Sequence, residues 1–154
     1  MPEVAMLKRW MPVLVVDDSL TMCAIMQEIL HALDFNDVQM RRSATEAINE
    51  LKRRDYGFVL CDVDMPAIDG FQLVNMMRRD EALGAVPVIL TTGYPSLITR
   101  MLKSGAPFPA SGFILKPFTA KDLRDKLSEV IESAYQRKEL LPRHFAGYSG
   151  VEPI

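Results

Sequence analysis

The stretch Phe58-Val59-Leu60-Cys61-Asp62 places four apolar residues directly before a carboxylate. A short, continuous apolar run is typical of a strand buried on both faces, as strands of a parallel sheet are. Open α/β sheets carry their chemistry at the carboxyl ends of their strands, where rigid backbone meets solvent. Asp62 is therefore the first candidate for a functional side chain, and its role depends on the partners that other strands supply.

Length and composition indicate one globular domain. The chain has 154 residues, of which 49% are hydrophobic and 25% charged, and its formal net charge is −2. This length allows one domain with a hydrophobic core, and the mild charge gives no electrostatic reason to expect nucleic-acid binding. We expect an N-terminal extension over 1–11, the domain over 12–136, and a tail over 137–154 that is flexible or packed on the surface.

The sequence indicates neither a secretion signal nor a membrane insertion. The apolar stretch near the N-terminus stops at Asp17 and Asp18, too early for a signal peptide, and no run of about 18 apolar residues follows. Cys23 and Cys61 lie in apolar surroundings without the spacing of a metal site, so buried thiols are expected. We therefore expect a cytoplasmic protein.

Apolar runs and helical patterns alternate along the chain. Strands are expected at 13–16, 38–40, 58–61, 88–90 and 112–115, and helices at 19–33, 43–54, 71–80, 95–103 and from 119 to about 134. Parallel strands need crossovers of helix length, so this alternation predicts an α/β fold with a doubly wound, five-stranded parallel sheet. In the first helix, Leu20, Cys23 and Leu30 are among the residues expected to face inward.

Polar side chains follow four of these strands. They are Asp17 and Asp18 after the first, Asp62 after the third, Thr92 after the fourth and Lys116 after the fifth. Clustered carboxylates need a cation or a raised pKa, and Mg²⁺ prefers oxygen ligands. A hydroxyl and an ammonium group beside them are suited to binding phosphoryl oxygens. The set predicts a site where an aspartyl phosphate forms on Asp62.

Each residue taken alone also has a plainer interpretation. Asp17 and Asp18 could cap a helix, Thr92 could simply end a strand, and Lys116 could be a solvated lysine. Their occurrence together, at one edge of the predicted sheet, favours a shared site.

Four motifs stand in a fixed order: Asp17-Asp18-Ser19, then Asp62-Val63-Asp64-Met65-Pro66 with Asp69-Gly70, then Thr91-Thr92-Gly93, and finally Gly112-Phe113-Ile114-Leu115-Lys116-Pro117-Phe118. This series, within roughly 12–134, resembles the receiver domains of bacterial two-component response regulators, and is most similar to the stand-alone chemotaxis type. The resemblance implies a flavodoxin-like (βα)5 fold with strand order 2-1-3-4-5.

The resemblance also implies roles for the acidic residues. Asp62 would be the phosphoacceptor and would receive its phosphoryl group from the phosphohistidine of a histidine kinase or from a phosphotransfer protein. Mg²⁺, for which Mn²⁺ could substitute, would be held by Asp18, Asp62 and the backbone carbonyl of Asp64. Asp17 would orient the ion through water.

The same resemblance implies a conformational switch rather than an enzyme with turnover. Thr92 and Lys116 would bind the phosphoryl group, and Thr92 and Phe113 would change position after phosphorylation. A cis peptide bond is implied between Lys116 and Pro117. An unknown downstream protein would read the face formed by the fourth helix, the fifth strand and the last helix, and a homodimer is possible.

Two residues depart from the pattern of the resemblance. Asp64 adds a negative charge near the phosphoryl site where many relatives have a neutral side chain, and Tyr94 is bulkier than the residues often found at its position. Both are expected to modulate the lifetime of the aspartyl phosphate. We hypothesise that Tyr94 shields the phosphoryl group from water.

Three alternatives remain open at this point. A phosphatase of the haloacid dehalogenase type also uses a nucleophilic aspartate, a threonine and a lysine, but takes its acidic metal-binding pair from downstream of the lysine, where only Asp122 and Asp125 stand here. A degenerate receiver would bind partners without phosphorylation. The chain could also be the receiver fragment of a hybrid kinase.

Overall fold

The computed structural model describes residues 11–105 and 110–136, with side chains up to residue 133. The tail predicted for 137–154 and nearly all of the extension predicted for 1–11 lie outside these residues. The described strands are β1 (Pro12–Val16), β2 (Asp37–Arg41), β3 (Phe58–Asp62), β4 (Val88–Thr92) and β5 (Gly112–Leu115). The helices are α2 (Leu20–Ala32), α3 (Ala44–Arg53), α4 (Gly70–Arg79), α5 (Pro95–Lys103) and α6 (Ala120–Gln136).

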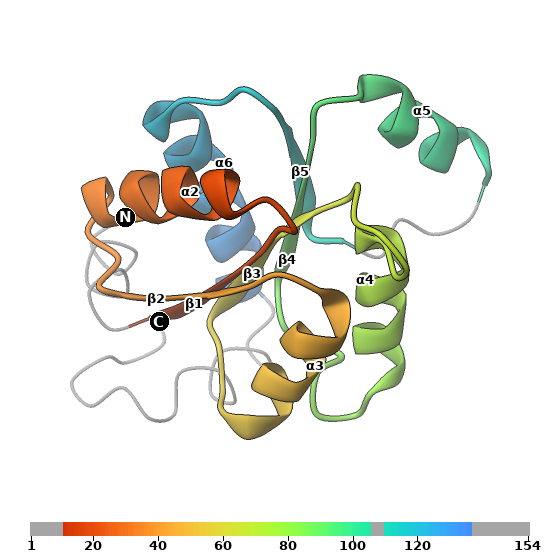
Figure 1. Ribbon diagram of the computed structural model, residues 1–154, viewed down its shortest axis with the longest axis horizontal. Coiled ribbons are helices and arrows are strands. Elements are labelled where there is room, and N and C mark those ends of the chain that lie inside the picture. Colours follow the sequence, from red (N-terminus) through yellow and green to blue (C-terminus); the bar gives the residue numbers. More distant parts are fainter. Residues whose placement is uncertain (1–10, 106–109, 137–154) are drawn as a thin grey trace.

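The strands form one parallel sheet in the order β2-β1-β3-β4-β5, which confirms the predicted flavodoxin-like fold. Figure 1 shows α2 and α6 together on one side of the sheet and α3 and α4 on the other, while α5 projects at the β4–β5 edge. Because every strand runs in the same direction, all carboxyl ends meet at one edge. That edge carries the polar residues that the sequence places after the strands.

The hydrophobic core lies in two layers, one on each face of the sheet. Every residue of β1, β3 and β4 is buried, which explains why these segments are continuous apolar runs instead of alternating ones. The α2 and α6 side packs Met26, Leu30 and Leu127 on the sheet, and the α3 and α4 side packs Leu51 and Leu73. The three central strands are thus held rigidly beneath their polar ends.

The inward-facing residues of α2 were predicted correctly except at its first turn. Ser19 caps the helix, and its hydroxyl accepts a hydrogen bond from the backbone N–H of Met22 at 3.2 Å. Cys23 and Leu30 are buried as predicted, but the prediction for Leu20 was wrong, since 62% of its surface is exposed. Its turn follows the carboxyl end of β1 directly, beyond the part of the sheet that α2 covers.

Membrane insertion has no candidate segment within the described chain. None of the helices in residues 11–105 and 110–136 is both long and apolar enough to cross a bilayer.

Gly70 allows α4 to begin directly against the end of β3. The N–H of Gly70 donates to the carbonyl oxygen of Val63 at 2.9 Å. A Cβ atom at position 70 would lie only 2.5 Å from the carbonyl oxygen of Asp62 and 2.8 Å from the Cα of Val63. Both neighbours are backbone atoms, so the clash could be relieved only by moving α4 or the loop that follows Asp62.

Substitution Gly70→Ala is therefore expected to lower the free energy of unfolding by about 1–3 kcal/mol, the usual cost of overpacking. Urea unfolding monitored by circular dichroism measures this change. Gly93→Ala is the matched control, because a Cβ at position 93 meets no atom within 4 Å. Equal stability of the Gly70→Ala variant and the wild type would contradict the packing argument.

Candidate functional site

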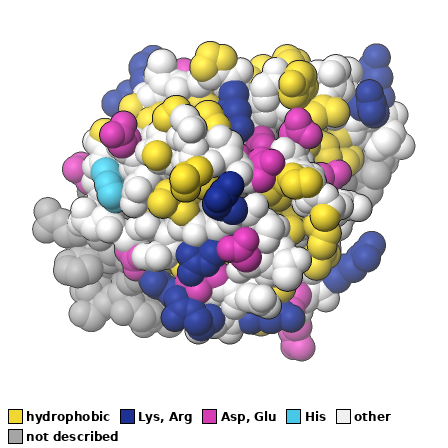
Figure 2. All heavy atoms as spheres, in the orientation of Figure 1, with side chains coloured by type: hydrophobic (Ala, Val, Ile, Leu, Met, Phe, Trp, Pro, Cys, Tyr) yellow, Lys and Arg dark blue, Asp and Glu magenta, His cyan; other side chains and the backbone are white. Residues whose placement is uncertain are grey.

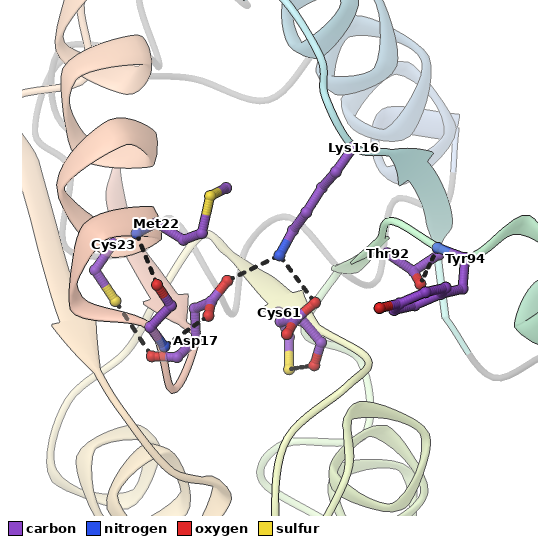
Figure 3. Close-up of polar contacts among 9 residues, drawn as sticks. Asp17, Met22, Cys23, Cys61, Thr92, Tyr94 and Lys116 are labelled. Atoms are coloured by element: carbon purple, nitrogen blue, oxygen red, sulfur yellow. Dashed lines mark hydrogen bonds and ion pairs between the residues drawn. The ribbon is translucent and has the colours of Figure 1, made fainter.

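Side chains from three strand ends meet through one lysine. Asp17 follows β1, Asp62 ends β3 and Lys116 follows β5. The ammonium Nζ of Lys116 donates to Oδ2 of Asp17 at 3.1 Å and to Oδ1 of Asp62 at 3.0 Å. Figure 3 shows the Lys116 side chain reaching from its strand toward Asp17. The structure therefore brings these three predicted residues together.

Asp18 completes a group of three carboxylates. One oxygen from each of Asp17, Asp18 and Asp62 lies within 4.8 Å of the others. Asp17 and Asp62 are buried, with 1% and 5% of their surfaces exposed, and Asp18 is half-buried. With all three ionised, Lys116 offsets one of three negative charges. This set of oxygen donors, with two charges left to balance, fits a hard divalent cation such as Mg²⁺.

Burial and Lys116 shift the pKa of Asp62 in opposite directions. Burial raises the pKa of the Asp62 carboxyl, and the hydrogen bond and charge of Lys116 offset only part of this effect. Burial also works against the charge of Lys116, but its hydrogen bonds to Asp62 and Asp17 outweigh burial and raise its pKa. Lys116 is therefore positively charged, and Asp62 is a carboxylate whose ionised form has a free-energy cost in the folded protein.

Asp17 is anchored on both of its oxygens. Its Oδ1 accepts the backbone N–H of Ser19 at 2.9 Å, while its Oδ2 accepts Lys116. The thiol of Cys23 donates to the Asp17 carbonyl at 3.3 Å, and this thiol is buried as predicted. Both oxygens of the Asp17 carboxylate are thus held in place by hydrogen bonds.

Thr92 and Tyr94 lie at the adjacent strand end. Thr92 is fully buried, and its Oγ1 accepts the backbone N–H of Tyr94 at 3.0 Å, as Figure 3 shows. The backbone of Lys116 bonds the carbonyl of Thr92 at 2.8 Å, which places the threonine beside the lysine. Tyr94 precedes α5, and 59% of its surface is exposed.

Phe113 and Asp64 have contacts other than the side chain of Lys116. Phe113 is half-buried in β5 opposite Leu90, and Nζ of Lys126 lies 5.9 Å from its ring centre. Asp64 is exposed, and its backbone N–H bonds the Asp62 carboxylate. The peptide bond between Lys116 and Pro117 is cis, as the motif resemblance implied.

One residue near the site was missed by sequence reasoning. The guanidinium of Arg42 donates from Nε and Nη2 to the backbone carbonyl of Asp18, at 3.3 and 3.2 Å. Arg42 directly follows β2, within the basic pair Arg41-Arg42. A pair of basic residues before a helix does not indicate that one of them bonds a backbone carbonyl 24 positions away.

Comparison with known protein families agrees with this geometry. The family model described as the response regulator receiver domain matches residues 13–128, which is most of the chain. The chain belongs to the response regulator receiver domain family. The match covers β1 through most of α6, so the receiver domain includes every strand end described above.

Similar receiver proteins include chemotaxis regulators. Chemotaxis protein CheY-3 of Vibrio cholerae is 35% identical over 128 residues, which are 83% of this chain and 97% of that protein. Chemotaxis protein CheY of Pseudomonas aeruginosa is 30% identical over 79% of this chain and 97% of that protein. The solved structure of CheY4 of Vibrio cholerae superposes with a TM-score of 0.69 at 24% identity, covering 78% and 98% of the two chains.

The raised pKa of Asp62 predicts a pH-dependent gain in stability when its charge is removed. A carboxyl group whose pKa is raised on folding binds protons more tightly in the folded state, so stability falls as the pH rises through that pKa. Asp62→Asn should therefore have a higher thermal midpoint than the wild type at pH 7 without divalent ions. The difference should narrow as the pH falls toward the ordinary aspartate pKa of 3.8.

The control for this comparison is Asp55→Asn, because Asp55 is exposed and precedes β3, at the opposite end of the strand from Asp62. Its thermal midpoint should match that of the wild type at each pH. A lower midpoint for Asp62→Asn at pH 7 would show that the Asp62 carboxylate stabilises the fold, contrary to this account.

Proposed function

We propose that this receiver domain accepts a phosphoryl group on Asp62 and signals through the conformational change that follows. The observation that carries the proposal is the position of Lys116, whose ammonium bonds Asp62 and Asp17 beside the carboxylate of Asp18. An acceptor carboxylate, a fixed cation and an oxygen-donor set occupy one edge of a rigid sheet. This combination supports phosphoryl transfer more directly than any purely structural role.

In the proposed transfer, a carboxylate oxygen of Asp62 attacks the phosphorus atom of a phosphohistidine. A P–O bond forms, the P–N bond breaks, and the imidazole nitrogen keeps the electron pair and takes up a proton. Mg²⁺ or Mn²⁺, held by Asp18, Asp62 and the Asp64 carbonyl, would supply positive charge against the phosphoryl oxygens. Lys116 already bonds Asp62, so its ammonium lies within reach of a phosphoryl group on the same side chain.

Thr92 and Phe113 are the proposed switch. The hydroxyl of Thr92 accepts a hydrogen bond from Tyr94 and keeps its own hydrogen to donate to a phosphoryl oxygen. Phe113 is half-buried in β5 and packs against the core layer on the α3 and α4 side of the sheet. Phosphorylation would favour the arrangement in which Thr92 contacts the phosphoryl group and Phe113 turns inward.

Two exposed apolar surfaces are proposed to bind protein partners. On α2, Leu20 and Ile25 are exposed, and Leu20 begins the helix that follows Asp17 and Asp18. Figure 2 shows hydrophobic side chains on this part of the surface. This face suits the helices of a histidine kinase or a phosphotransfer protein. Leu102 of α5 and Leu115 of β5 are exposed on the face proposed for a downstream protein, while a homodimer would form through the exposed apolar side chains of α2.

The carboxylates of α6 argue against a phosphatase of the haloacid dehalogenase type. Such an enzyme would need an acidic pair from downstream of Lys116 at its metal site. Asp122 instead caps α6, where its carboxylate accepts the backbone N–H of Thr119 at 2.9 Å. Asp125 is exposed beside Lys121. The carboxylates that do join Asp62 come from upstream.

Intact-mass measurement after incubation with acetyl phosphate and Mg²⁺ tests the proposed function. The wild type should gain the mass of one phosphoryl group, and the gain should be lost with a chelator or in Asp62→Asn. Asp69→Asn serves as the acidic control and should still be modified, because Asp69 acts as the N-cap of α4. Equal modification of wild type and Asp62→Asn would contradict the proposal, and steady hydrolysis of a generic phosphomonoester would favour the phosphatase.

Substitution Tyr94→Ala is expected to shorten the lifetime of the phosphorylated state. The Tyr94 side chain is exposed next to Thr92, where an aromatic ring can limit the access of water to an aspartyl phosphate. Loss of the phosphoryl mass after removal of acetyl phosphate gives the rate. Tyr94→Phe is the control and should retain the wild-type lifetime, whereas an unchanged lifetime in Tyr94→Ala would end the shielding hypothesis.

A further inference from the structure

Of the three clustered carboxylates, those of Asp17 and Asp62 are held by hydrogen bonds, whereas that of Asp18 depends on its backbone for its direction. Asp17 is fixed by Ser19 and Lys116, and Asp62 by Lys116 and the backbone of Asp64. The Asp18 carboxylate accepts no hydrogen bond from any residue in the described part of the chain. Its direction is therefore set by the backbone that carries it.

That backbone lies between two regular elements and belongs to neither. The N–H of Asp17 makes a sheet-type bond to the carbonyl of Arg41 at 3.1 Å, and the first α2 bond runs from Cys23 to the carbonyl of Ser19 at 3.0 Å. The carbonyl of Asp18 falls between these two bonds. The N–H side of the peptide group joining Asp18 to Ser19 already bonds Oδ1 of Asp17 at 2.9 Å. A donor to the carbonyl side would hold the other side of this peptide group, and so restrict the backbone angles that set the direction of the Asp18 side chain.

Arg42 supplies that donor. Two of its N–H groups converge on the Asp18 carbonyl, at 3.3 and 3.2 Å. Arg42 is itself well anchored through its neighbours, since Arg41 pairs with the buried Glu50 at 3.2 Å and Ser43 caps α3. The guanidinium therefore connects a fixed β2–α3 corner to the carbonyl side of the peptide group that follows Asp18.

We infer that Arg42 is a positioning residue, which holds the Asp18 carboxylate in the direction needed for binding a divalent cation. This inference rests on the proposed function, because it assigns Arg42 to the metal-binding step at the same site.

The charge of Arg42 and its positioning of Asp18 predict opposite effects on Mg²⁺ affinity when Arg42 is removed. As a cation near three carboxylates, Arg42 repels a divalent ion, so its removal should strengthen metal binding if charge alone mattered. Exposed charges interact weakly because water screens them. Groups that orient metal ligands typically change metal affinity by about 10–100-fold when they are removed. Positioning should therefore outweigh repulsion.

The test is calorimetric titration of the full chain with Mg²⁺, which reports binding without any phosphorylation. Arg42→Ala should weaken Mg²⁺ binding by about tenfold, at the lower end of the range for groups that orient ligands. Arg42→Lys should recover part of the loss, since its ammonium keeps the charge and one donor. Arg79→Ala is the control, because Arg79 is exposed near the end of α4, and it should bind as the wild type does.

Two results would overturn the inference in distinguishable ways. If the wild type binds Mg²⁺ and Arg42→Ala binds it equally or more tightly, Arg42 does not position Asp18, while the proposed function stands. If the wild type itself does not bind Mg²⁺, both the inference and the metal-assisted function fail. Thermal unfolding without Mg²⁺ shows whether Arg42→Ala has a folding defect. If it does, the folded Arg42→Lys variant decides. A lower Mg²⁺ affinity of Arg42→Lys than of the wild type supports the inference, and an equal affinity overturns it.

Discussion

The arrangement of the site depends on one ammonium group that is shared by two buried carboxylates. Asp17 and Lys116 are 99 positions apart in the sequence and lie on strands separated by β3 and β4. Neighbouring strands are about 4.8 Å apart, so the lysine must lean across the ends of the intervening strands to reach its partners. A long, flexible stem with a compact charge meets this requirement, and the buried strands keep both carboxylates within its reach.

This arrangement leaves the unmodified site short of positive charge. Two buried carboxylates and a third at their side share one lysine, and burial raises the pKa of Asp62 in spite of it. A buried charge with incomplete pairing lowers stability, whereas a group that neutralises it binds favourably. The fold therefore holds a cluster of carboxylates to which a cation would bind favourably. The ionised Asp62 carboxylate lowers the free energy of unfolding, and this cost is the physical reason why the site responds to ligands that neutralise it.

The sequence was sufficient to predict the fold and the residues that cluster at the strand ends, but not the contacts that these residues make. Apolar runs ending in polar residues identified the buried strands, because those strands are covered on both faces. Strands β2 and β4 were each predicted two residues too short, because the apolar pattern leaves out the polar residues at the ends of these strands. Leu20 was placed inside wrongly because helical spacing cannot show where α2 passes the end of the sheet. Arg42 was missed because its partner is a backbone carbonyl, which sequence patterns do not reveal.

If Asp62 accepts the phosphoryl group, its carboxylate becomes an acyl phosphate, which chemical trapping can locate in the sequence. Borohydride reduces an acyl phosphate to an alcohol, which converts the phosphorylated aspartate into homoserine. After phosphorylation with acetyl phosphate and Mg²⁺, peptide mapping by mass spectrometry locates the reduced residue. Homoserine is expected at position 62 only, and only when Mg²⁺ is present. Reduction at Asp17, Asp18 or Asp64 instead, with position 62 unmodified, would contradict it.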